Sequence, residues 1–258
     1  MTPETPQSFE VRTECVKAAF DNGFRRELGE EKGWARFQST TVPGDIWLAG
    51  AGMHGPWFLA LDHAGVAAAL DRPEADMSGP GLARYSFASL TPLYGVLRQV
   101  YQLAASLPDA PLEAFRGSIR KLPASTEAER LVIQRVGQDI FRQALLDFWD
   151  GACAVTGVRT TPLLRASHII PWAECGSDAE RLNVYNGLLL AAHLDAAFDA
   201  HLISFDETGR MLFSPLLPED DCRRLGLDEN MRLRRSPARL RKRLKIHRQV
   251  MSEKAQEG

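Results

Sequence analysis

Residues 165–199 read RASHIIPWAECGSDAERLNVYNGLLLAAHLDAAFD and decide how the second half of the chain is interpreted. His168 is followed 18 residues later by Asn186, and then by Asp195 and Asp199, which are one helical turn apart. A histidine titrates near neutral pH and can act as a general base. Two carboxylates at i and i+4 share one helix face and can reach the same cation. The stretch therefore predicts a base and a divalent-metal site in one small unit, as phosphodiester hydrolysis requires.

The local pattern around this stretch predicts a ββα arrangement. PLLRASHIIP (162–171) is expected to be a strand that carries His168 near its end. A polar loop follows over 172–185, and Asn186 with Gly187 is expected to open a helix through GLLLAAHLDAAFDAHL. LISFDETGRMLFSP (202–215) is typical of a hairpin with its turn at Asp206–Gly209.

This segment resembles the HNH endonuclease family over roughly residues 150–215. The similarity is closest to the branch in which SHI-x-P-W is followed by NGLLL and then by a D-x-x-x-D helix ending in FD. The family builds a ββα-metal site from a first-strand His, a middle Asn and a helical ligand. His168 and Asn186 match the first two, whereas Asp195 and Asp199 fall at helical ligand positions.

The resemblance implies a role for each of these residues. His168 is expected to be the general base, and Asn186 to orient it by fixing the loop between the strands, or else to cap the helix. Asp195 and Asp199 are expected to hold Mg²⁺ (or Mn²⁺), because these ions prefer oxygen ligands. Ser167 stands where many members carry an Asp or His ligand, so it is a weaker candidate ligand. No role is assigned to the neighbouring histidines 193 and 201.

The cysteines and the hydropathy pattern limit the class of protein. Four cysteines lack CxxC pairing, which is typical of a reducing cytoplasm. Cys153 occupies the first place of the family's zinc cysteines but Thr156 fills the second, so no structural zinc is expected. The sequence shows neither a signal peptide nor the run of roughly 18 apolar residues that a membrane helix needs, and we expect a cytoplasmic protein without a membrane partner.

Basic residues are concentrated near the C-terminus. Residues 231–252 contain nine Lys or Arg and no acidic residue, in a chain of net charge −2. Such a block favours contact with nucleic-acid phosphates, although a solvated terminal helix explains it equally well. The candidate phosphate contacts are Arg165, Arg239, Arg241, Lys242, Arg243 and Lys245.

The domain organisation predicted from the sequence is α+β throughout. An N-terminal α+β recognition or regulatory domain (1–107) is followed by a proline-containing linker (108–124), the HNH nuclease domain (125–230) and a basic C-terminal helix or tail (231–258). A long helix, capped by Ser125 and ending at Gly151, is expected to introduce the nuclease domain. Strand aromatics of the first domain, among them Trp47, could form a base-binding cage but more often are sheet core.

The sequence thus predicts a metal-dependent HNH endonuclease of the bacterial restriction or defence type. Its partner is expected to be double-stranded DNA, and because a double-strand cut needs two active sites, a homodimer is one way to supply them. Two alternatives remain open. The protein could bind nucleic acid through an inactive HNH fold, or it could be a toxin-like nuclease that cuts RNA or any DNA.

Overall fold

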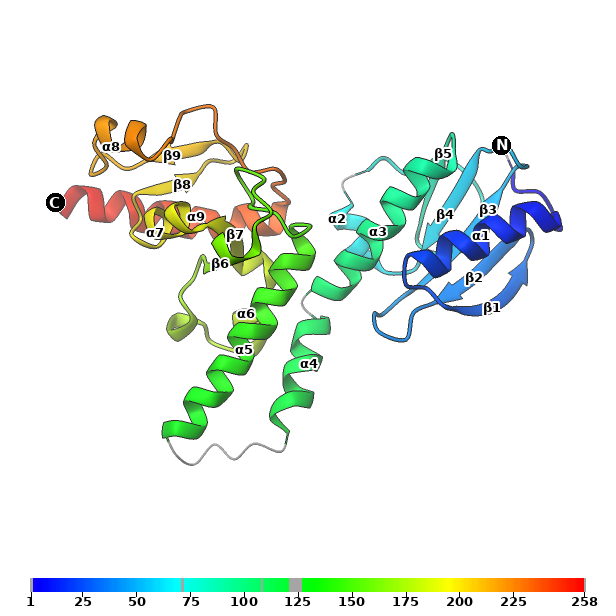
Figure 1. The fold of residues 1–258 in the computed structure, drawn as a ribbon, viewed down its shortest axis with the longest axis horizontal. Coiled ribbons are helices and arrows are strands. Elements are labelled where there is room, and N and C mark those ends of the chain that lie inside the picture. Colours follow the sequence, from blue (N-terminus) through cyan, green and yellow to red (C-terminus); the bar gives the residue numbers. More distant parts are fainter. Residues whose placement is uncertain (1, 71, 108, 121–126, 258) are drawn as a thin grey trace. The chain divides into compact units, whose positions relative to one another are not determined.

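A computed structural model describes residues 2–70, 72–107, 109–120 and 127–257. The chain divides into two compact units, Met1–Ala110 and Pro111–Gly258, and each is described by itself (Figure 1). Helices and sheets occur in both units, which confirms the predicted α+β class. Within the described residues, no helix is long and apolar enough to cross a membrane.

The first unit is built on a five-stranded antiparallel sheet whose strands are neighbours in sequence order. The strands are β1 (Arg26–Glu31), β2 (Trp34–Gln38), β3 (Asp45–Gly50), β4 (Trp57–Leu61) and β5 (Ala83–Phe87). Strands β2 to β5 lie where the sequence predicts them. Strand β1 was not predicted, because RELGEE is an exposed edge strand without apolar alternation.

Helices α1 (Phe9–Asp21) and α3 (Leu90–Ser106) cover one face of this sheet (Figure 1). Their buried faces include Val11, Cys15 and Leu93. A short helix α2 (Ala64–Ala69) precedes β5. The other face carries a smaller apolar cluster around Trp34 and Phe58, so strand β4, between β3 and β5, is buried on both sides.

Two helices, α4 (Asp109–Ile119) and α5 (Glu127–Phe148), come next, and α4 begins two residues before the second unit does. Helix α4 lies where the prolines predicted a linker. Pro111 sits in its first turn, where the missing N–H has no helical partner to lose, so this proline does not break the helix. Helix α5 confirms the predicted long helix, whereas its expected cap, Ser125, lies outside the described residues.

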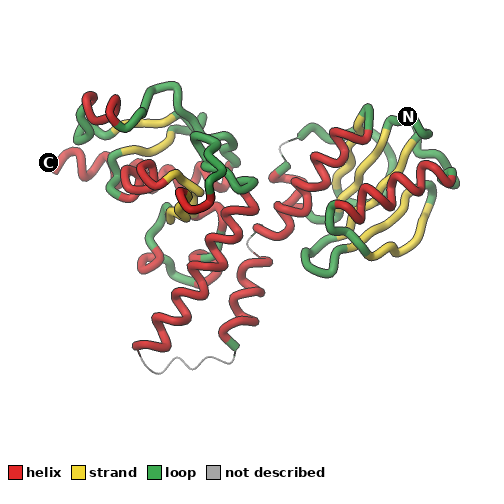
Figure 2. The backbone as a smooth tube through the Cα atoms, in the orientation of Figure 1, coloured by secondary structure: helices red, strands yellow, loops and turns green. Residues whose placement is uncertain are grey.

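The predicted ββα arrangement is present, with one boundary corrected. Strand β6 (Leu164–His168) pairs antiparallel with β7 (Gly187–Ala191), and helix α7 (Ala192–Asp199) follows at once (Figure 2). The prediction that Asn186 opens the helix is wrong, because GLLLA is a fully buried strand. A short apolar run is typical of buried strands and buried helices alike. Here it forms a strand because β6 provides it with a hydrogen-bonding partner.

The remaining elements complete the second unit. They are η1 (Thr161–Leu163), η2 (Trp172–Glu174), α6 (Asp178–Arg181), η3 (Val184–Asn186), β8 (Ile203–Phe205), β9 (Met211–Phe213), α8 (Glu219–Arg224) and α9 (Ala238–Glu257). The hairpin β8–β9 turns where predicted, and Asp206 Oδ1 accepts hydrogen bonds from the Thr208 and Arg210 amides. Helix α9 packs inward through Leu240, Leu244, His247 and Met251, a stripe at helical spacing.

Candidate functional site

His168 ends strand β6 and is half-buried between aromatic rings. Its ring stacks on Phe141 of α5 with centroids 3.9 Å apart, and Trp172 contacts it edge-on at 5.7 Å. Its Nε2 lies 2.9 Å from the Arg181 carbonyl oxygen, which can only accept, so Nε2 carries the proton. Nδ1 is then an acceptor, and within the described residues no hydrogen bond engages it. Burial lowers the pKa of His168, which favours this neutral form.

Asn186 fixes the loop that leaves His168. Its side chain is fully buried, its Oδ1 accepts a hydrogen bond from the Ile170 amide at 3.0 Å, and its Nδ2 donates to the Ile170 carbonyl at 3.2 Å. Nδ2 also lies 3.3 Å from the Cys175 sulfur. These contacts are those of a residue that holds a loop, not of a helix cap, since strand β7 and not a helix follows it.

Ser167 faces the opposite side of strand β6 from His168, toward helix α7. Its buried hydroxyl donates a short hydrogen bond to Asp195 Oδ1. Asp199 follows one turn later on the same helix and is exposed. Although the residue as a whole is exposed, its carboxyl group is partly buried, and this partial burial and, secondly, the charge of Asp195 raise the pKa of Asp199. The two carboxylates therefore repel each other, and a cation between them would relieve that repulsion.

A cavity of about 360 Å³ lies against strand β6 and the end of helix α7. It is lined by Ser167, His168, Asp199, His201 and His247, together with apolar residues of the strand end. Asp195 does not line this cavity but reaches it indirectly, through Ser167. His168, the predicted base, and Asp199, one of the two predicted helical carboxylates, therefore line the same cavity.

Two histidines of this cavity were missed by sequence reasoning. His201 lies just past helix α7, and His247 lies on α9, 46 positions further along the chain. His201 has a left-handed backbone with φ of 58°, which is unusual for a residue other than glycine. No local pattern marks His247, because its neighbours in the fold come from α7 and β8.

Asp195, Asp199 and Ser167 offer oxygen donors of the kind that a hard divalent cation prefers. Among the described residues no three His, Cys, Asp or Glu side chains form a metal-binding group. The set consists of two carboxylates and the Ser167 hydroxyl, and oxygen donors of this kind suit Mg²⁺ or Mn²⁺ with water and phosphate as further ligands. The Cys153 sulfur accepts a hydrogen bond from the Ala191 amide of strand β7 at 3.3 Å.

The basic residues proposed as phosphate contacts are not equivalent in the structure. Arg243 pairs with Glu180 at the end of the loop after β6, and Arg239 lies over the Tyr185 ring at 5.7 Å. Arg241 donates to the Ser236 carbonyl, and Arg165 to the Pro162 and Leu164 carbonyls. Lys242 and Lys245 are exposed, and among the described residues no carboxylate pairs with either.

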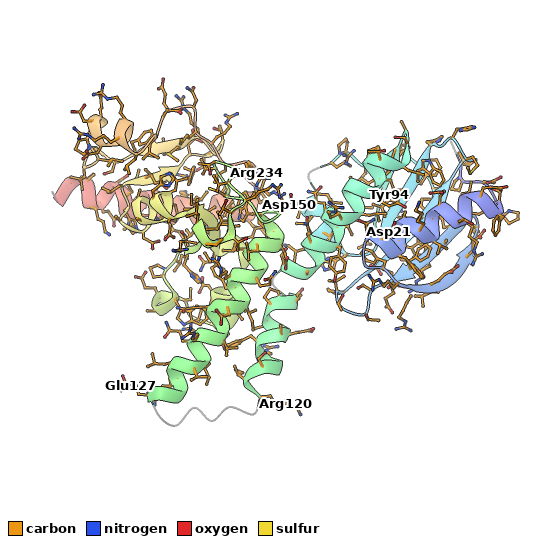
Figure 3. The ribbon with its side chains drawn as sticks, in the orientation of Figure 1. Asp21, Tyr94, Arg120, Glu127, Asp150 and Arg234 are labelled. Atoms are coloured by element: carbon orange, nitrogen blue, oxygen red, sulfur yellow. The ribbon has the colours of Figure 1, made fainter. Side chains whose placement is uncertain are left out.

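The beginning of the basic block is structural. Arg234, which lies near the end of α5 (Figure 3), donates to the Trp149 carbonyl at 3.2 Å. Arg235 donates to the Phe148 carbonyl at 2.7 Å, so both arginines hold the end of this helix. A helix C-terminus favours such cations because its last carbonyls lack helical partners.

The aromatic residues of the first unit differ from one another in burial. Trp57, Phe58 and Tyr85 are each about 1% exposed and belong to the sheet core. Trp47 is half-buried and, with Trp34, lines a separate cavity of about 600 Å³. The structure thus favours the core interpretation for most of these rings.

The hairpin, the helix and the cavity-lining histidine together define a ββα nuclease-type site. Residues 153–206 match the family described as HNH endonuclease. The match confirms the resemblance inferred from the sequence. No curated protein matches the chain.

Proposed function

We propose that this protein is a metal-dependent endonuclease that hydrolyses phosphodiester bonds of double-stranded DNA. The observation that carries the proposal is the shared cavity, which is lined by His168, Asp199 and Ser167. The family match supports nuclease chemistry in general. Its extension to DNA and to a restriction or defence role is our proposal.

In the proposed reaction His168 is the general base. Nδ1 takes a proton from a water molecule, the water oxygen bonds to phosphorus, and the bond to the 3′-oxygen breaks. The Arg181 carbonyl holds the ring in the required tautomer, as carbonyl partners of catalytic histidines do. Asn186 keeps the following loop, and hence the ring, in place.

The helix side of the site would hold the cation. Asp195, Asp199 and the Ser167 hydroxyl are the residues available, and a bound Mg²⁺ or Mn²⁺ would offset the charge that develops on the phosphate and the departing oxygen. Ser167 positions Asp195 by their hydrogen bond, so this serine contributes even as a weak ligand.

The remaining regions suggest how substrate is selected. We propose that exposed lysines of α9 bind backbone phosphates without reading sequence, while the first unit selects the substrate or a partner. A double-strand cut would require two copies of the site, which a homodimer would supply. Chromatography with light scattering, with and without DNA, measures that state.

The test compares the full chain with His168→Ala on methylated and unmethylated plasmid, phage DNA and RNA, with Mg²⁺ or Mn²⁺ added. We expect cleavage of DNA by the wild type and a loss of about 10²- to 10⁴-fold in the variant, the range of general-base catalysis. Both proteins should unfold at similar urea concentrations.

Two other results would identify the alternatives. Retardation of DNA in a gel without cleavage, and no change in His168→Ala, would indicate an inactive nucleic-acid-binding protein. Cleavage of RNA, or of every DNA regardless of modification, would indicate a nonspecific toxin-like nuclease.

A further inference from the structure

His201 occupies a backbone position that glycine usually takes. The His201 amide donates to the Phe198 carbonyl at 2.8 Å and the Leu202 amide to the Ala197 carbonyl at 2.9 Å, which is the Schellman arrangement at the end of α7. The residue after the helix must then be left-handed, and His201 has φ of 58°. Strained positions of this kind concentrate at functional sites.

A stack of three rings holds the His201 side chain. Phe198 and His247 are parallel within 4° with centroids 3.8 Å apart, and His247 and His201 within 6° at 4.3 Å. His247 cannot turn, since its Nε2 donates to the Phe198 carbonyl and its Nδ1 accepts from the Ser204 hydroxyl. His201 therefore lies against a fixed, uncharged surface at the cavity.

The hydrogen-bond partners of His201 constrain its tautomer. Nδ1 lies 3.1 Å from the Lys254 ammonium nitrogen and 3.1 Å from the Asp199 carbonyl oxygen. An ammonium only donates and a carbonyl only accepts, so Nδ1 serves one of them at a time. When Lys254 donates, the ring proton resides on Nε2, which has no hydrogen-bond partner within the described residues.

We propose that His201 contacts the substrate, donating its Nε2–H to a non-bridging oxygen of the phosphate bound in the His168 cavity. This inference rests on the proposed nuclease function and adds a residue to that site. A phosphate oxygen only accepts, so its binding selects the tautomer in which Lys254 engages Nδ1. The cavity then presents one imidazole acceptor, His168, and one imidazole donor, His201.

The experiment separates the ring from the backbone that carries it. His201→Gly removes the donor but accepts the left-handed conformation, so the variant should melt at the wild-type temperature or above it. Cleavage of supercoiled plasmid under single-turnover conditions with Mg²⁺ should fall about 10- to 100-fold, the worth of a hydrogen bond to a charged group.

Two further variants complete the set. His193→Ala removes an exposed histidine of helix α7 that does not line the cavity, and it should cut like the wild type. His201→Asn keeps an N–H donor and tolerates the left-handed backbone, so it should recover part of the loss.

The outcomes distinguish this inference from the proposed function. If the wild type cuts, His168→Ala does not and His201→Gly cuts within twofold of the wild type, only the role of His201 is overturned. If His201→Gly melts several degrees lower, the ring is structural and the inference is again overturned. If the wild type cuts no nucleic acid at all, the nuclease function itself fails and the role of His201 fails with it.

Discussion

The ring nitrogens that carry protons in His168 and His247 determine which hydrogen bonds each ring can make at the cavity. A carbonyl oxygen facing His168 Nε2 leaves Nδ1 as an acceptor, whereas two hydrogen bonds lock His247 as a neutral, inert ring. Both rings are mostly buried, and burial lowers the pKa of each. Among the described residues, the same residue type thus has one ring nitrogen engaged at position 168 and both engaged at position 247, because their partners differ.

Asp195→Asn tests the cation-binding side of the site. The variant keeps the size of the side chain and a partner for Ser167 but removes one charge, so we expect the Mg²⁺ concentration for half-maximal cleavage to rise at least about tenfold. Metal titration of the cleavage rate measures it. Glu219→Gln, which removes an exposed carboxylate on α8, is the control. An unchanged metal requirement in Asp195→Asn would exclude Asp195 as a ligand.

His247 should make stability depend on pH. Burial of the ring, with a smaller contribution from His201, lowers the pKa of His247 to about 4, against 6.5 for an unperturbed histidine. The unfolded chain therefore binds a proton between these values and the folded chain does not. Stability is full above pH 6.5 and falls as the pH drops toward 4, by about 3 kcal/mol at most.

Urea unfolding at pH 7.5 and pH 4.5 measures this effect, with His247→Gln as the non-titrating comparison. The wild type should lose more free energy of unfolding between the two pH values than the variant loses. Equal losses would mean that His247 protonates alike in the folded and unfolded chains.

At the scale of elements, the β6–β7 hairpin depends on close contact with helix α5. Gly187 pairs with His168 across the two strands, and a Cβ built on it would lie 2.4 Å from Phe141 Cζ and 2.9 Å from the Ser167 carbonyl oxygen. Phe141 is the ring on which His168 stacks. The absence of a side chain at position 187 therefore lets helix α5 support the His168 ring directly.

Gly187→Ala should push the hairpin away from α5. We expect a loss of about 1–3 kcal/mol in the free energy of unfolding, the usual range for overpacking, together with reduced cleavage because His168 shifts. Gly117→Ala, on α4 with open space around its Cβ position, should leave stability unchanged or raise it. Urea unfolding of the two variants makes the comparison, and equal midpoints would contradict the tight contact.

At the scale of the whole molecule, some cationic side chains pair within the fold, whereas others are exposed and available to bind phosphate. The chain has a net charge of −2, yet α9 displays Lys242 and Lys245 free of carboxylate partners among the described residues. Arg243 is paired with Glu180, so part of the basic block holds α9 to the loop near the site. Electrostatic attraction to DNA thus depends on where cations lie, and not on the net charge.

Replacing both lysines by Glu should weaken DNA binding and make it less sensitive to salt. If each lysine meets one phosphate, the slope of log K against log [salt] should fall in magnitude by about 2. Arg223→Glu with Arg224→Glu on α8 makes the same change in net charge and is the matched control. Equal effects of the two pairs would show that α9 is not a specific contact surface.

The sequence by itself determined the class of site. Short-range sequence patterns are enough to predict a strand that ends in His168 and a polar loop that leads to Asn186. They also predict a helix that places Asp195 and Asp199 on one face. The spacing of these residues is a property of the local chain, so it identified the HNH segment before any contact was known. The α+β class and most strands of the first unit followed from hydrophobic periodicity in the same way.

Only the tertiary structure decided which of the other residues join the site. His201 reaches the cavity because α9 supplies His247 beneath it and Lys254 beside it, contacts that span 46 and 53 positions of sequence. Strand β7 replaces the expected helix turn because β6 offers it hydrogen bonds, and Arg243 turns inward because Glu180 is there. These outcomes depend on packing between segments that are distant in sequence, and such packing cannot be predicted from local residue patterns.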